Sequence, residues 1–188
     1  YSNTTASNNT AIGTEALKTN STGAENTAVG AYSLDANTTG SSNTSVGYSS
    51  LGANTSGVSN TAVGVEALLN NSNASYNTAL GRSAGRATTS GSNNVAIGYE
   101  AFKSNTTGHT SVAVGDSALK TNVSGTGNTA LGYNSLEFNT NSGNTGVGYK
   151  SLEANTSGHS NVAVGNSALL NNTTGSLNVA IGRYALET

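Results

Sequence analysis

One short sequence unit repeats along the whole chain. A glycine that closes an apolar run recurs every 17 residues, with a single interval of 16 between Gly132 and Gly148. Read from one asparagine to the next, the consensus is N-T-A-V-G-x-x-A-L-x-x-N-T-T-G-x-x. A fixed short period indicates stacked units, each of which buries its apolar residues only against its neighbours. The closing glycines are Gly13, Gly30, Gly47, Gly64, Gly81, Gly98, Gly115, Gly132, Gly148, Gly165 and Gly182.

The unit is too short for a pair of helices, and its β-branched residues and glycines disfavour helix. It fits one coil of a solenoid, with a short strand at N-T-A-V-G, a second extended stretch at x-x-A-L and a return turn at N-T-T-G. The repeat therefore predicts an all-β fold, a parallel β-solenoid (β-roll) of eleven 17-residue coils, with residues 1–188 as a single array. At about 4.8 Å per coil, the array is roughly 50 Å tall.

Composition limits the partners. The net charge is −2 and only 9% of residues are charged, which gives no reason to expect binding to nucleic acid. No apolar run approaches the roughly 18 residues that span a bilayer, so membrane insertion is not expected. Cysteine is absent, which excludes a disulfide scaffold, and no motif calls for a cofactor or metal.

Alternation along the strand divides its residues between two faces. We expect the residues on both sides of the strand centre to face inward. One such column holds Val29, Val46, Val63, Leu80, Ile97, Val114, Leu131, Val147, Val164 and Ile181, and the other holds Thr27, Thr44, Thr61, Thr78, Val95, Val112, Thr129, Thr145, Val162 and Val179. A third apolar column, from Leu17 to Leu186, is interrupted by Gly85.

The residue at the strand centre would then face outward, yet it is always small. Uniform smallness beside a column of glycines favours lateral packing of chains, most simply as a trimer; the alternative is that small residues ease a tight bend within one coil. The predicted chain-packing face consists of Ala28, Ala62, Ala79, Ala96, Ala113, Ala130, Ala163 and Ala180.

Neither end of the array shows an atypical, polar capping repeat, and the sequence starts and stops at nearly the same phase of the unit. Isolated solenoids need such caps to protect their strand edges. The expectation is an uncapped array that forms a segment of a longer fibre.

Two asparagine columns run along the stack, one before the strand and one at the return turn. Asparagine tolerates left-handed backbone and its amides can form ladders, so a structural role is one interpretation. The other is glycosylation, because many turn asparagines begin N-x-S/T sequons. The candidate glycosylation sites are Asn3, Asn20, Asn37, Asn54, Asn105, Asn122, Asn155 and Asn172.

Little in the chain suggests catalysis. Gly81–Gly85 matches G-x-S-x-G, but lacks the strand–turn–helix context and the histidine that this motif requires. His109 and His159 share a phase three coils apart, too far to share a metal. Tyrosines such as Tyr48, Tyr99 and Tyr149 follow the closing glycine, where they serve as structural cover or contact sugars. The chain is not expected to be an enzyme.

The strings NVAIG at 94–98, SVAVG at 111–115 and NVAVG at 161–165 resemble the head repeats of trimeric autotransporter adhesins. The full unit, as in residues 26–40, is similar to repeats of tail-fibre-like bacterial and viral surface proteins. This resemblance implies a left-handed, trimeric β-roll at the cell or virion surface.

Together these features predict a non-catalytic, self-associating extracellular fibre or adhesin shaft, with homo-oligomers and cell-surface glycans as its partners. The alternative is a solenoid module that binds glycans or ice. Thr27, Thr44, Thr61 and Thr78 offer a regular hydroxyl ladder for ice, although the face assignment above turns them inward.

Overall fold

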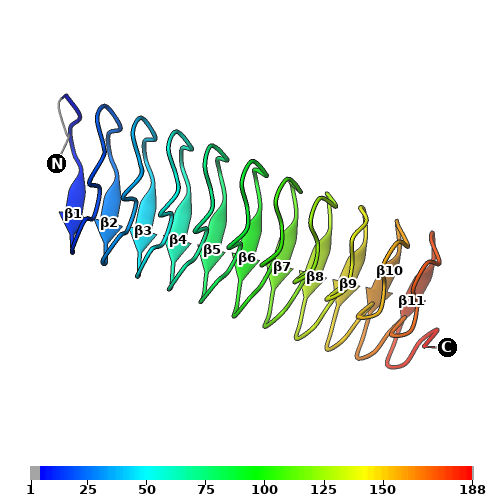
Figure 1. Cartoon of the computed structure of the whole chain (residues 1–188). Coiled ribbons are helices and arrows are strands. Elements are labelled where there is room, and N and C mark those ends of the chain that lie inside the picture. The colour runs from blue at the N-terminus through cyan, green and yellow to red at the C-terminus, as the bar shows by residue number, and fades with distance from the viewer. Residues whose placement is uncertain (1–4, 188) are drawn as a thin grey trace.

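The computed structural model describes residues 5–187 and shows one stack of coils with a single short strand in each (Figure 1). The eleven strands pair in chain order into one sheet that runs the length of the stack. They are β1 Thr10–Ile12, β2 Thr27–Val29, β3 Thr44–Val46, β4 Thr61–Val63, β5 Thr78–Leu80, β6 Val95–Ile97, β7 Val112–Val114, β8 Thr129–Leu131, β9 Thr145–Val147, β10 Val162–Val164 and β11 Val179–Ile181.

All strand pairs are parallel, and equivalent residues of successive repeats lie side by side. Thr27 pairs with Thr44, and Val29 with Val46. The pairing of Thr129 with Thr145 keeps this register across the shortened repeat, so the lost residue is absorbed in the loop. The predicted all-β parallel solenoid is confirmed.

The closing glycine is required by the backbone. At Gly30 φ is +129°, a conformation that side chains rarely adopt, and an added Cβ would lie 2.6 Å from the carbonyl oxygen of Gly47. The same close approach recurs at every closing glycine from Gly13 to Gly165, and Gly182 of the last coil keeps the same backbone conformation with φ of +123°, which explains why this column is glycine.

The x-x-A-L stretch is a turn and not the second extended segment that the repeat suggested. Tyr32 and Leu34 both have left-handed backbone, with φ of 59° and 50°. Left-handed residues thus alternate with an ordinary one, which bends the chain tightly. The bend turns Leu34 inward, where it is fully buried. Gly85 replaces this leucine in one coil. Its φ of +58° shows the same backbone conformation, so only the buried side chain is missing there.

The face assignment within the strand was wrong. The central residue points inward and the two flanking residues point outward, so the expected chain-packing face is part of the core of a single chain. The small residues Ala28, Ala62, Ala79, Ala96, Ala113, Ala130, Ala163 and Ala180 are all 0–3% exposed. Their size has a local cause: a three-residue strand packs directly on the A-L turn of its own narrow coil, which leaves room for little more than a methyl group.

Two exceptions to the alanine column are matched by serines across the core. Ser33 Oγ donates to Ser45 Oγ at 2.8 Å, and Ser45 Oγ also contacts Ser50 Oγ. At Gly146 an added Cβ would lie 2.7 Å from Ser135 Oγ, whose hydroxyl donates to the Gly146 carbonyl at 2.9 Å. Polar groups therefore enter this core in hydrogen-bonded sets.

Both asparagine columns are structural. Before each strand, the side chain of one coil caps the next: Asn26 Oδ1 accepts from the backbone N–H of Asn43 at 3.0 Å, and Asn26 Nδ2 donates to the carbonyl of Gly40 at 2.9 Å. At the turn, Asn37 Nδ2 donates to the same Gly40 carbonyl at 2.9 Å. In most coils the two columns thus meet on one backbone carbonyl, which belongs to a glycine in most repeats and to Ala74 or Asn141 in two of them.

The turn asparagines also bond to one another along the stack. Asn37 Nδ2 donates to Asn20 Oδ1, Asn54 to Asn37 and Asn71 to Asn54, each at 2.8 Å. This amide ladder is disrupted further along. Thr88 replaces the next asparagine, and the buried atoms Asn71 Oδ1, Asn105 Oδ1 and both polar atoms of Asn122 have no hydrogen-bond partner.

Candidate functional site

The most extended surface with functional character is the outer face of the sheet, which we call the sheet face and define by the residues that flank each strand centre. One of its columns is mainly threonine and the other is entirely Val, Leu or Ile. Leu80 and Leu131 are each 47% exposed, and Val164 is 37% exposed. A solvated strand would normally present polar side chains here, so a continuous apolar column marks a surface suited to contact.

The threonine column lies on the same face, with its side chains outward. Thr27, Thr44 and Thr61 are partly exposed and occupy successive register positions. Strand pairing places such equivalent residues about 4.8 Å apart along the stack, and flanking residues of one strand lie about 6.6 Å apart. The objection that these hydroxyls face inward therefore does not hold.

The sequons are not accessible glycosylation sites in the folded chain. Asn20, Asn37, Asn54, Asn105, Asn122 and Asn155 are 0–1% exposed. A glycan attaches to Nδ2, but that atom of Asn54 already donates to Asn37 Oδ1 and to the Gly57 carbonyl at 3.1 Å. Asn172 Nδ2 is committed in the same way to Asn155 Oδ1, at 2.9 Å, and Asn3 lies outside the described residues. Glycosylation at the described sequons is thus contradicted by their position inside the turn.

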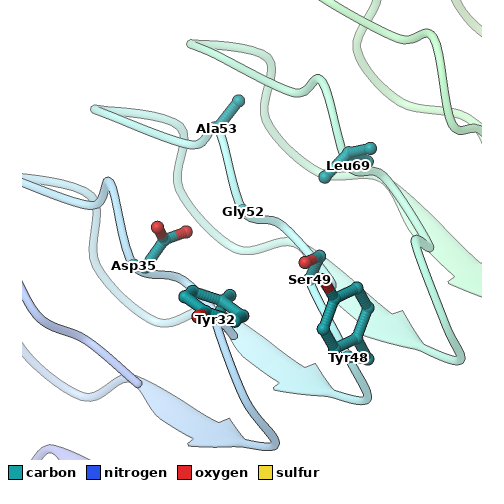
Figure 2. Close-up of a pocket in the computed structure, with 7 residues that line it drawn as sticks. All are labelled: Tyr32, Asp35, Tyr48, Ser49, Gly52, Ala53 and Leu69. Atoms are coloured by element: carbon teal, nitrogen blue, oxygen red, sulfur yellow. The ribbon is translucent and has the colours of Figure 1, made fainter. Parts of the chain in front are cut away.

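On the turn side, a surface hollow of about 390 Å³ lies between the coils of β2, β3 and β4 (Figure 2). It exists because Gly52 stands where neighbouring repeats carry Asp35 and Leu69. The hollow is lined by Tyr32, Asp35, Tyr48, Ser49, Gly52, Ala53 and Leu69.

Two tyrosines and one carboxylate dominate this hollow. The rings of Tyr32 and Tyr48 meet edge to face, with centres 5.8 Å apart and planes at 81°. Figure 2 shows the Asp35 carboxylate beside the Tyr32 ring. Burial raises the pKa of Asp35, an effect that its own backbone N–H partly opposes. Among residues 5–187, Asp35 forms no salt bridge.

A second charged cluster joins the coils of β6 and β7. Glu100 accepts from Lys103 at 2.6 Å and lies 2.8 Å from Lys120 of the following coil. Hydrogen bonds from these two ammonium groups lower the pKa of Glu100 to about 2. All three groups satisfy one another, so the cluster acts as a clasp between coils.

The catalytic motifs considered from sequence are not assembled into a site. Ser83 of the G-x-S-x-G match is 6% exposed, and its hydroxyl is 3.5 Å from Glu66. His109 and His159 are exposed. Across residues 5–187 no three His, Cys, Asp or Glu side chains converge as a metal site would require. The same residues contain no helix of the length and apolarity needed to cross a membrane.

No protein-family model, curated protein or solved structure matches this chain.

Two of these features were missed in the sequence. The sheet face was missed because period-two alternation does not say which face is inside. The hollow was not predicted because Gly52 lies at a position whose residue varies from repeat to repeat; a glycine among long side chains, with tyrosines in its own and the preceding repeat, was the available signal.

Proposed function

We propose that the chain is a structural, non-catalytic shaft of an extracellular fibre or adhesin, which associates with copies of itself through the sheet face. The observation that carries this proposal is the continuous column of partly to largely exposed Val, Leu and Ile on an in-register sheet. The residues of this column differ in size but never in polarity, as expected for a surface that is covered.

A mechanical role is supported by how the coils are joined. Every consecutive strand pair is hydrogen-bonded in register, and asparagine side chains add further bonds between coils inside the stack. Because every coil is bonded to its neighbours in the same register, the stack can present its outer faces at a regular spacing.

Self-association follows from the apolar area of the sheet face. Burying an apolar surface contributes about 25 cal/mol per Å². A face about 10 Å wide and roughly 50 Å long buries on the order of 1,000 Å² over two partners, which reaches the lower limit of specific interfaces. The threonine hydroxyls beside the apolar column can bond across such an interface or keep bound water.

Sedimentation velocity with electron microscopy tests this proposal. We expect the purified chain to form dimers, trimers or filaments, and Leu131→Lys to shift it toward monomers. Tyr133→Lys is the matched control, because Tyr133 is 46% exposed and lies off the sheet face, whereas Leu131 is 47% exposed on it. A chain that stays monomeric at every concentration contradicts the proposal.

A second candidate function, ice binding, gains support from the outward threonine column. A rigid face that repeats hydroxyl and methyl groups at two fixed spacings can order the water above it. Thr27, Thr44, Thr61 and Thr78, preceded by Thr10 of β1, form the longest uninterrupted run of threonine in the column.

Thermal hysteresis of the monomeric chain distinguishes the two functions. Ice binding predicts a hysteresis gap that Thr61→Lys abolishes and that Tyr133→Lys leaves unchanged. Absence of any gap at micromolar protein removes this second function and leaves self-association as the use of the face.

A further inference from the structure

We infer that the hollow between Tyr32, Tyr48 and Asp35 is a binding site for an organic cation, specifically an alkylammonium group such as that of a lysine side chain. This inference is independent of the proposed shaft, because the hollow lies on the turn side and contains no residue of the sheet face.

The first argument is electrostatic. Asp35 is half-buried, has no salt bridge among residues 5–187, and lines the hollow together with Tyr32 and Tyr48, whose ring faces are electron-rich. Lys18 is the nearby cation in the preceding coil, but its ammonium pairs with Glu15 at 2.9 Å. Lys18 therefore acts on Asp35 only through its longer-range charge, and the Asp35 carboxylate has no salt-bridge partner within residues 5–187.

The second argument comes from the other tyrosines of the chain. Three of them receive cations from the chain itself, whereas Tyr76 and Tyr133, in the part of the chain that the structure describes, do not. Arg82 lies 5.9 Å from the ring centre of Tyr99, Lys150 lies 5.8 Å from that of Tyr149, and Arg183 lies 4.5 Å from that of Tyr184. No such contact is found for Tyr32 or Tyr48 within residues 5–187. These two rings line the open hollow together with the Asp35 carboxylate instead.

The third argument is the shape of the hollow. An added Cβ at Gly52 would lie 3.4 Å from Asp35 Oδ1 and 3.2 Å from Leu69 Cδ1, so a ligand above Gly52 meets the acid on one side and an apolar wall on the other. An alkyl chain that ends in an ammonium group satisfies both, with cation–π attraction from the tyrosines. A neutral sugar would leave the carboxylate charge unpaired.

Nuclear magnetic resonance titration of the whole chain with n-butylammonium tests the site, with n-butanol as the neutral probe of the same shape. We expect saturable shifts at the amides of Gly52 and Ala53 with the ammonium only, weakening as salt is added. Asp35→Asn should weaken binding about tenfold or more, as loss of a charge-assisted contact implies. Asp116→Asn, an exposed acid outside the hollow, should change nothing.

A second variant keeps the test sharp. Lysine occupies the Gly52 phase at Lys18, Lys103 and Lys120, so Gly52→Lys fits the repeat and places an ammonium beside Asp35. We expect it to abolish binding without loss of fold. Equal binding of butanol and butylammonium, unchanged binding by Asp35→Asn, or shifts with a neutral monosaccharide alone would overturn the inference.

The natural source of the group is decided by a further probe, lysine blocked at both backbone ends. Binding at least as tight as that of butylammonium indicates a lysine side chain of a protein partner. Clearly weaker binding indicates a free alkylamine.

Discussion

The turn column of asparagines behaves differently in two regions of the stack. From Asn20 to Asn71 each amide bonds to the next at 2.8 Å. Between Asn71 and Asn139 no amide bonds to the next, Asn122 makes no side-chain hydrogen bond, and Asn105 reaches Thr88 only at 3.5 Å. The backbone path is the same in both regions, so the repeat does not depend on an unbroken ladder.

The difference shows what the ladder adds. Strand register and the closing glycines are present in every described coil, and they define the solenoid. The ladder contributes stability between particular coils, and where it is missing the Glu100 clasp joins the coils of β6 and β7 from outside. Local stability should therefore vary along a stack whose shape does not.

The largest expected effect comes from placing a charge in the intact ladder. Asn54→Asp replaces two donated hydrogen bonds with a carboxylate that faces two acceptors, Asn37 Oδ1 and the Gly57 carbonyl. We expect a loss of about 3–5 kcal/mol in the free energy of unfolding, measured by urea denaturation followed by circular dichroism. Asn73→Asp, at an exposed position, is the control and should have little effect.

Alanine substitution compares the two regions directly. Asn54→Ala should cost about 1–3 kcal/mol, because it leaves the buried Asn37 Oδ1 without a donor. Asn122→Ala should cost less than about 1 kcal/mol or stabilise the fold, since the side chain has no bonds to lose. Equal losses in the two variants would show that the ladder is not the source of the difference.

Restoring the missing amide of the ladder should increase the free energy of unfolding. Thr88→Asn supplies an amide donor to Asn71 Oδ1, which is buried without a partner. We expect stabilisation of about 1 kcal/mol, seen as a higher urea midpoint and slower amide exchange in the coils of β4 and β5. The control is Thr107→Asn, which adds the same side chain at an exposed site of the next coil.

Lowering the pH should weaken the Glu100 clasp, and we expect this to be the smallest of the effects on stability. The pKa of Glu100 is lowered from 4.5 to about 2 in the folded chain, so its contribution is fully present above pH 4.5 and is lost as pH falls toward 2. Burial raises the pKa of Glu137. Protonation of this group therefore favours the folded chain as pH falls, which is opposite to the effect of Glu100.

The corresponding measurement is amide exchange in the β6 and β7 coils as pH is lowered. Glu100→Gln should remove most of its pH dependence below 4.5, while the coils of β2 and β3 keep theirs. If the variant retains the full acid response, the clasp is not what joins these coils.

The sequence predicted the solenoid because its period, glycine column and leucine column each follow from a repeated backbone. It did not predict which face of the strand is inside. A column of alanines can be explained on the outer face, by packing of chains, or on the inner face, by lack of space. Only the narrowness of the coil shows that the inner face is correct. Likewise, nothing in the sequence shows that the sequon asparagines Asn37 and Asn54 are buried. The left-handed turn that precedes them rotates their amides inward.

Thiol labelling of single-cysteine variants tests the central claim that the sheet face is the working surface. The chain has no cysteine of its own, so Ala130→Cys, Leu131→Cys and Tyr133→Cys each report one site. We expect rapid labelling of Leu131→Cys in dilute protein and protection of this site on assembly. Ala130→Cys should stay protected throughout, and Tyr133→Cys should stay reactive. Labelling of Ala130→Cys as fast as Leu131→Cys, or a Leu131→Cys site that stays fully reactive in assembled material, would contradict this claim.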